Sequence, residues 1–208
     1  MAGGIQEALR KTRIRTREEL DNQAKVLSMT AQEFTQRSLP YFLASGTLLG
    51  IFRDKALIPW DWDVQFYFRT EDAVQRLDEV CEALDKAGVA LVRREVRSPT
   101  DEFKVVGLCS GVKVEITSWT EAGEFRVRRD SRIPADIFES AGSIDFGGES
   151  FRTFCEIEQY LEWCYGDWRT PIRTSKKSLY LAAQFGKEQK PFLSGLWYRW
   201  ARRRAQSR

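Results

Sequence analysis

Two aspartates at alternate positions are the residues of this chain best suited to chemistry. Asp61 and Asp63 lie in the apolar and aromatic segment 60–68, which is expected to form a strand. Side chains alternate along a strand, so both carboxylates should lie on one face together with Gln65. Adjacent carboxylates repel each other and are costly to desolvate, and a divalent cation relieves both costs. Oxygen ligands of this kind predict Mg2+ or Mn2+, which bind one or two carboxylates and substrate phosphates.

A glycine turn precedes the aspartates and predicts an anion-binding site. The apolar run 41–44 predicts a short strand that ends at Ser45-Gly46-Thr47, where glycine lets the backbone turn sharply and approach a ligand. A helix-like piece follows at 48–52, and its free backbone N–H groups would point at a phosphate over Gly46 and Thr47. The alternative is that Gly46 only ends a strand and that the aspartates face solvent.

Three sequence blocks resemble a known family. The motifs G-T-L-L-G-x-x-R, I-P-W-D-x-D-V and, at 165–171, Y-G-D-W-x-x-P resemble the LicD and fukutin-related family of the nucleotidyltransferase-fold superfamily. The resemblance covers roughly residues 40–172 and implies an α+β fold, with a nucleotidyltransferase-like mixed β-sheet flanked by helices. Many relatives read D-x-D-[IV]-D, whereas the last position here is Gln65.

The resemblance also implies an enzyme, a phosphotransferase of the LicD type. Such an enzyme moves an alcohol phosphate (choline, ribitol or glycerol phosphate, or a phosphonate) from a CDP- or CMP-activated donor to a hydroxyl of a glycan or glycolipid. Two other functions stay open. One is a nucleotidyltransferase that uses an NTP, and the other is an inactive family member that serves as a docking scaffold on membrane or RNA.

Nine residues receive expected roles from this resemblance. The expected catalytic and metal-binding residues are Asp61, Asp63 and Glu115, the expected donor-phosphate contacts are Gly46, Thr47, Arg53 and Lys104, and the expected substrate contacts are Trp60 and Asp167. Glu115 would complete the metal shell or accept the proton of the acceptor hydroxyl. Its alternative is a surface ion pair with Lys113 or Lys104, and Arg53 and Lys104 could be ordinary surface cations.

Composition limits the classes of protein that remain. The 208 residues are 42% hydrophobic and 30% charged, which is ordinary for one globular domain. Histidine is absent, which excludes His-based triads and His-ligated zinc. The four cysteines have no C-x-x-C spacing and receive no chemistry. We expect a cytoplasmic protein, because no signal peptide or run of about twenty apolar residues appears.

The net charge of +3 conceals an asymmetry between the body and the end of the chain. Residues 199–208 include five arginines and no acid, so residues 1–198 sum to −2 and nucleic-acid binding by the body is not expected. The segment 191–204 predicts a helix with tryptophan and leucine on one face and arginine opposite. That pattern is compatible with peripheral contact of 191–208 with the inner face of a membrane; the alternative is docking on the domain or on a second subunit, since amphipathic helices pack on protein more often than on lipid.

Three regions should position the candidate site. We expect an N-terminal helix within 1–38, formed by residues 5–37, then a catalytic domain at 39–172 and a helical, basic and amphipathic tail at 173–208. Within the catalytic domain, a helix capped by Thr70 should end at Gly88. Strands are expected at 89–96, 103–109 and 112–119, with Ser110-Gly111 as a tight hairpin, followed by short strands within 125–155 and a helix at 156–164.

Overall fold

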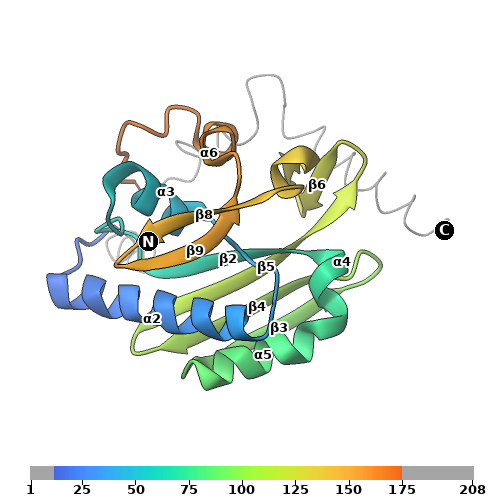
Figure 1. Cartoon of the computed structure of the whole chain (residues 1–208), viewed down its shortest axis with the longest axis horizontal. Helices are drawn as coiled ribbons and strands as arrows, with labels where there is room; N and C mark the ends of the chain where they lie inside the picture. The colour runs from blue at the N-terminus through green and yellow to red at the C-terminus, as the bar shows by residue number, and fades with distance from the viewer. Residues whose placement is uncertain (1–11, 175–208) are drawn as a thin grey trace, which may run out of the picture.

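A mixed β-sheet lies at the centre of the computed structural model, which describes residues 12–174 (Figure 1). Its main order is β1-β2-β5-β4-β3, with β6 and β7 continuing from β5, and only β2 and β5 are parallel. The strands are β1 (Phe42–Leu43), β2 (Asp63–Arg69), β3 (Ala90–Arg97), β4 (Glu102–Cys109), β5 (Val112–Ala122), β6 (Phe125–Arg128) and β7 (Ser131–Pro134). The expected strands and the hairpin at Ser110-Gly111 are confirmed, and both turn residues have positive φ.

Helices α2 (Arg17–Gln36) and α5 (Leu77–Lys86) cover one face of this sheet (Figure 1). The ring of Phe34 on α2 meets Phe66 and Phe68 of β2 edge to face, at centroid distances of 5.2 and 5.5 Å. These even-numbered residues of β2 are fully buried. The odd-numbered residues, which include Asp63, therefore lie on the opposite face of the sheet.

That opposite face carries α3 (Ser45–Asp54), α6 (Ile157–Tyr165) and the hairpin of β8 (Ala141–Phe146) and β9 (Glu149–Phe154) (Figure 1). The hairpin is held to β1 by a stack of Phe154 on Phe42, with ring centroids 4.9 Å apart. The Thr153 hydroxyl also donates to the Leu43 carbonyl at 2.8 Å. Sequence segments more than a hundred residues apart thus enclose the candidate site.

The N-terminal helix begins later than expected. Within the described part of the chain, residues 12–16 are not helical, and α2 starts at Arg17. Thr16 and Glu19 form a capping box, in which each side chain accepts a bond from the other residue's backbone N–H (3.2 and 2.8 Å). The prediction of a helix already present at residues 12–16 is wrong, because this box fixes the start.

The prediction of one helix from Thr70 to Gly88 is also wrong in detail. It is divided into α4 (Thr70–Ala73), a 3₁₀ turn η1 (Val74–Arg76) and α5. Thr70 is not the cap; its hydroxyl is buried and bonds to Ser118 at 2.9 Å and to Thr120 at 3.0 Å on β5. A side chain committed to the sheet cannot cap a helix, so tertiary contacts override the local signal.

The expected helix at 191–204 and the rest of the helical tail beyond residue 174 lie outside the described residues. Between residues 12 and 174, no helix has both the length and the apolar character needed to cross a bilayer.

Candidate active site

Asp61 and Asp63 meet at the start of β2, although only Asp63 belongs to the strand. The turn after Pro59 places Asp61: its backbone N–H donates to the Ile58 carbonyl at 2.9 Å, and its Oδ1 accepts from the Trp62 N–H at 3.0 Å. Our prediction that both aspartates lie on one strand is therefore wrong for Asp61. The proline and the turn still bring the two carboxyl groups into contact.

This acid pair has unusual electrostatics. Burial raises the pKa of Asp61 well above its ordinary value, and the charge of Asp63 and a hydrogen bond with it raise the pKa further. Asp63 itself is only 6% exposed. Two carboxyl groups in contact, one buried and one half-buried, retain a proton unless a cation compensates their charge. The acid pair therefore favours binding of a cation.

Gly46 lets the Asp61 carboxylate lie against the first turn of α3. A Cβ atom at this position would stand 2.0 Å from Asp61 Oδ2, so no larger residue fits without displacing that carboxylate. Free N–H groups at a helix start attract anions, but a phosphate placed beside Asp61 would be repelled by it. A divalent cation held by the Asp61 carboxylate would offset that repulsion.

Thr47 ties α3 to β2 instead of presenting its hydroxyl to solvent. The residue is 1% exposed, and its Oγ1 accepts from the Gln65 N–H at 3.2 Å and donates to the Asp63 carbonyl at 3.4 Å. Its side chain thus holds the strand backbone that carries Asp63. A contact between the Thr47 backbone N–H and the donor phosphates stays a prediction.

Lys113 on β5 bridges two of the three predicted acids. In the parallel β2–β5 ladder it lies directly opposite Asp63. Its Nζ lies 2.6 Å from Asp63 Oδ2, 3.0 Å from Glu115 Oε2 and 5.0 Å from the centre of the Trp62 ring. From the sequence, we expected Lys113 to form at most a surface ion pair with Glu115. Its position opposite Asp63 results from the register of two parallel strands, which the sequence did not predict.

Glu115 is held by two lysines. Lys104 on β4 contacts its Oε1 at 2.7 Å, while Lys113 contacts its other oxygen. Burial alone would raise the pKa of Glu115, but the charges and hydrogen bonds of both lysines lower it to about 2. The carboxylate is therefore ionised at neutral pH and already compensated. The alternative expected from the sequence was an ion pair of Glu115 with Lys113 or Lys104, and Glu115 pairs with both lysines. Glu115 lies on an inner strand of the sheet and not on an exposed edge.

A second cation near the acid pair was not predicted from the sequence. Arg15 precedes α2, and its backbone N–H donates to the Pro59 carbonyl at 2.8 Å. Burial lowers the pKa of its guanidinium, and the charges of Asp61 and Asp63 act in the opposite direction. No sequence signal places Arg15 here, because long-range bonds hold the segment before α2: the Arg15 N–H donates to the Pro59 carbonyl, and the Arg173 Nε donates to the Thr12 carbonyl at 2.7 Å.

Three other residues predicted to belong to the site, Arg53, Asp167 and Trp60, do not take part in the ion pairs around Asp61 and Asp63. Arg53 lies seven residues beyond Gly46 on α3, about 10 Å along the helix. It bonds both oxygens of Asp54 (2.8 and 2.7 Å) and the Trp168 carbonyl at 3.2 Å. Asp167 is exposed and accepts from Thr170 at 2.7 Å.

Trp60 is half-buried and packs against the core. These contacts show how the sequence blocks meet: the Phe52 ring on α3 contacts the Trp168 ring at 5.5 Å. Substrate contacts by Trp60 and Asp167, and a phosphate contact by Arg53, stay predictions.

The acid pair suits one divalent cation. Within residues 12–174, no group of three acidic, cysteine or histidine side chains is arranged to hold a metal. Mg2+ commonly uses one or two carboxylates together with substrate phosphates, which Asp61 and Asp63 can provide. The ammonium of Lys113 already lies between Asp63 and Glu115. Glu115 is therefore not joined to the acid pair as a third ligand in this arrangement.

Solved structures with this fold are nucleotidyltransferases. The chain is similar to ANT(2'')-Ia in complex with adenylyl-2''-tobramycin, with 14% identity and a TM-score of 0.50 over 89% of this chain and 94% of that one. It is also similar to the solution structure of the antibiotic-resistance factor ANT(2'')-Ia, with 16% identity and a TM-score of 0.52 over 90% and 96%. A putative nucleotidyltransferase from Thermotoga maritima matches with 13% identity and a TM-score of 0.43 over 67% and 81%. The two ANT(2'')-Ia structures show that the chain has the nucleotidyltransferase fold, as expected.

Residues 38–153 match the sequence profile described as LicD/FKTN/FKRP, nucleotidyltransferase domain. The match covers more than half of the chain, and the chain belongs to this family. No curated protein matches the sequence significantly. Family and fold together show a transferase-type enzyme.

Proposed function

We propose that this enzyme is a LicD-type phosphotransferase, which moves an alcohol phosphate from a CDP- or CMP-activated donor to a hydroxyl of a glycan or glycolipid. One observation carries the proposal: the Asp61 carboxylate, in contact with that of the buried Asp63, lies against the glycine at the start of α3, in a chain of this family. Phosphoryl transfer requires positioning and charge compensation more than covalent chemistry. The acid pair and the helix start can provide both.

Several residues of the chain would divide this work. Asp61 and Asp63 would hold Mg2+ or Mn2+, which when bound polarises phosphoryl oxygens and offsets their charge. The first turn of α3 would bind phosphate oxygens through its N–H groups. Lys113 holds Asp63 in place and supplies a fixed positive charge beside it. Glu115, with a pKa of about 2, stays ionised and paired with the two lysines, and it is therefore a poor proton acceptor at neutral pH.

A nucleotidyltransferase that uses an NTP is the second candidate. The observation in its favour is that the ANT(2'')-Ia structure contains an adenylylated aminoglycoside, a product in which the nucleotide part is retained. The same acid pair can serve either reaction, since both displace a group at phosphorus. The two differ in which fragment is released.

Identification of the released nucleotide separates these candidates. The full chain would be incubated with Mn2+ and, separately, CDP-choline, CDP-glycerol, CDP-ribitol, a CMP-phosphonate and CTP, with glycan acceptors present. Release of CMP from an activated alcohol supports the proposal, and pyrophosphate release from CTP supports the second candidate. Asp63→Asn should reduce either rate at least a hundredfold. A rate that survives this substitution argues against the acid pair as the site.

The scaffold alternative depends on the tail at 191–208, which lies outside the described residues. Absence of turnover with every donor, together with binding to liposomes, would support it.

A further inference from the structure

Three buried hydrogen-bonding groups without partners lie where β5 meets β6. Thr117 and Trp119 are 3% and 4% exposed. Within residues 12–174, the Thr117 hydroxyl, the Trp119 indole Nε1 and the Arg128 Nε have no hydrogen-bond partner. An unpaired buried polar group typically costs about 1–3 kcal/mol. Three such groups on neighbouring residues indicate a missing polar ligand.

Strand register places these groups together. Thr117 and Trp119 are two residues apart on β5 and therefore lie on one face. The β5–β6 ladder pairs Thr120 with Val127, so the next step of the antiparallel ladder brings Arg128 beside Trp119. Thr117 is flanked by Tyr67 on β2 and by Lys104 on β4.

The charge of the Arg128 guanidinium also acts on the two residues that flank Thr117. Burial raises the pKa of Tyr67 to about 12, and the charge of Arg128 is among the effects that oppose this rise. Burial also lowers the pKa of Lys104; Glu115 opposes that shift, and the charge of Arg128 adds to it. Arg128 therefore acts on the residues at both flanks of Thr117.

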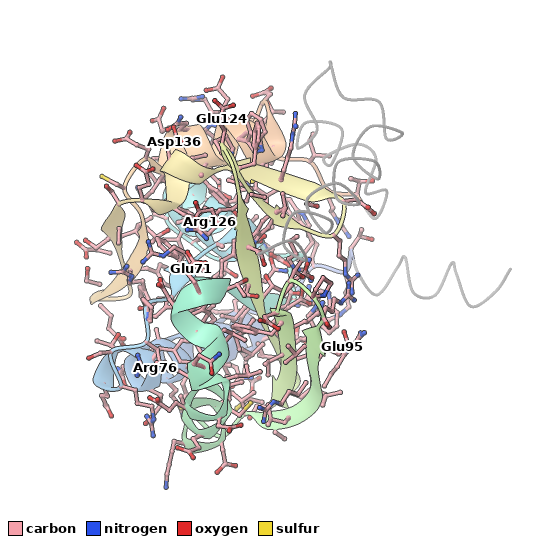
Figure 2. All side chains as sticks on the ribbon, turned by 90° about the vertical axis from the view of Figure 1, so that its right-hand side faces the viewer. Glu71, Arg76, Glu95, Glu124, Arg126 and Asp136 are labelled. Atoms are coloured by element: carbon pink, nitrogen blue, oxygen red, sulfur yellow. The ribbon has the colours of Figure 1, made fainter. Side chains whose placement is uncertain are left out.

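The neighbouring Arg126 has an ion-pair partner, which Arg128 lacks within the described residues. Arg126, on the same strand, bonds both oxygens of Glu71 at 3.0 and 2.6 Å, and Figure 2 shows the two side by side. None of the ion pairs within residues 12–174 includes Arg128. On the same face of β5 as Thr117, Glu115 is already compensated by Lys104 and Lys113, and Glu121 lies 4.0 Å from Arg126.

We propose that Arg128, Thr117 and Trp119, bordered by Lys104, form a phosphate-binding site separate from the acid pair. The groups present are an arginine fork, an ammonium, a hydroxyl and an indole N–H, which together match an anion with several acceptor oxygens. Phosphate binding here needs neither turnover nor a metal. Only the further assignment of that phosphate to a substrate rests on the proposed function.

Titration of inorganic phosphate into the full chain tests this site. The experiment uses calorimetry in a buffer with EDTA and no nucleotide, so that its failure does not bear on the transfer assay. Arg128→Gln should weaken phosphate binding about tenfold or more, the loss of one charge-assisted contact. Arg94→Gln is the matched control, because it removes the same charge from a residue that pairs with Asp78 on α5. Equal affinities of wild type and Arg128→Gln would overturn the proposal.

Thr117→Val separates binding from folding. Loss of an unpaired buried hydroxyl should leave the free energy of unfolding unchanged or higher, while phosphate affinity falls severalfold. A lower unfolding free energy with unchanged phosphate affinity would overturn the role of Thr117.

The source of the phosphate is tested by competition. If CMP displaces inorganic phosphate, the site belongs to the activated donor. If phosphate binds equally well to the CMP complex, the site holds a phosphate of the acceptor. Either outcome requires that Arg128→Gln weaken the phosphate binding that is being competed, and an unchanged phosphate affinity in the variant would again reject the site.

Discussion

At the scale of single residues, Asp61 is held in a state that costs stability. Its raised pKa means that the folded chain binds a proton there more tightly than the unfolded chain. Stability is therefore lost as pH rises above 3.8, the ordinary value for an aspartate. Such strain at a buried acid is typical of a functional position.

Asp61→Asn should separate stability from activity. In EDTA, the unfolding free energy of the variant should exceed that of wild type, by a margin that grows as pH rises from 4 to 7, because the amide never needs to ionise. Activity should fall at least a hundredfold. Urea unfolding at both pH values and the CMP-release assay measure these effects. A pH-independent difference in stability would show that Asp61 is not under this strain.

Among the residues of the site, we expect the loss of Lys113 to affect its contacting residues most. Lys113→Met leaves Asp63 without its ammonium and removes one of two partners of Glu115. We expect the unfolding free energy to fall by about 2 kcal/mol at pH 7, the usual scale for charged hydrogen bonds. Addition of Glu115→Gln should restore part of this loss, since the two residues interact directly. Strict additivity of the two changes in urea unfolding would contradict the bridge.

The pH dependence of that loss follows from Glu115. Its folded pKa of about 2 lies below its ordinary value of 4.5, so the stability it supplies is present above pH 4.5 and is lost as pH falls toward 2. The difference between wild type and Lys113→Met should shrink over the same interval.

At the scale of elements, the strand ladder was predictable and the acid environment was not. Alternating apolar residues predicted β2, β4 and β5, and Ser110-Gly111 predicted the hairpin of β4 and β5. The position of Lys113 opposite Asp63 depends on how β2 and β5 pair across about fifty residues of intervening chain. Local patterns carry no information on such a register. For the same reason, neither Arg15 beside the acid pair nor the division of the helix after Thr70 could be predicted.

The start of α3 makes a prediction at this scale. Gly46→Ala should favour the helix by up to about 1 kcal/mol, yet its Cβ would occupy the place of Asp61 Oδ2. The carboxylate should be displaced, with activity reduced at least tenfold and folding little changed. In the Asp61→Asn background, Gly46→Ala should cause no further loss of activity, because both changes act through one carboxylate. A further tenfold loss in the double variant would assign Gly46 another role.

At the scale of the whole molecule, the site is assembled from segments that are remote in sequence. Ser45 begins α3, and its backbone N–H donates to the hydroxyl of Tyr160 on α6 at 2.9 Å. The Ser45 hydroxyl meets the Tyr67 hydroxyl on β2 at 2.7 Å. The sequence blocks around 46 and 165 were expected to share a function, and the structure shows that their helices also support each other physically.

Tyr160→Phe tests whether α6 holds the start of α3 in place. Without the phenol oxygen, the Ser45 N–H loses its partner, and we expect the unfolding free energy to fall by about 1–3 kcal/mol. Tyr41→Phe is the matched control: Tyr41 is equally buried, and its hydroxyl accepts from the Arg152 N–H at 3.3 Å, on β9 and not on α3. Both variants should lose stability in urea unfolding, but only Tyr160→Phe should also slow CMP release, because only that bond positions the helix start beside Asp61. Equal slowing in both variants would mean that α6 contributes general stability alone.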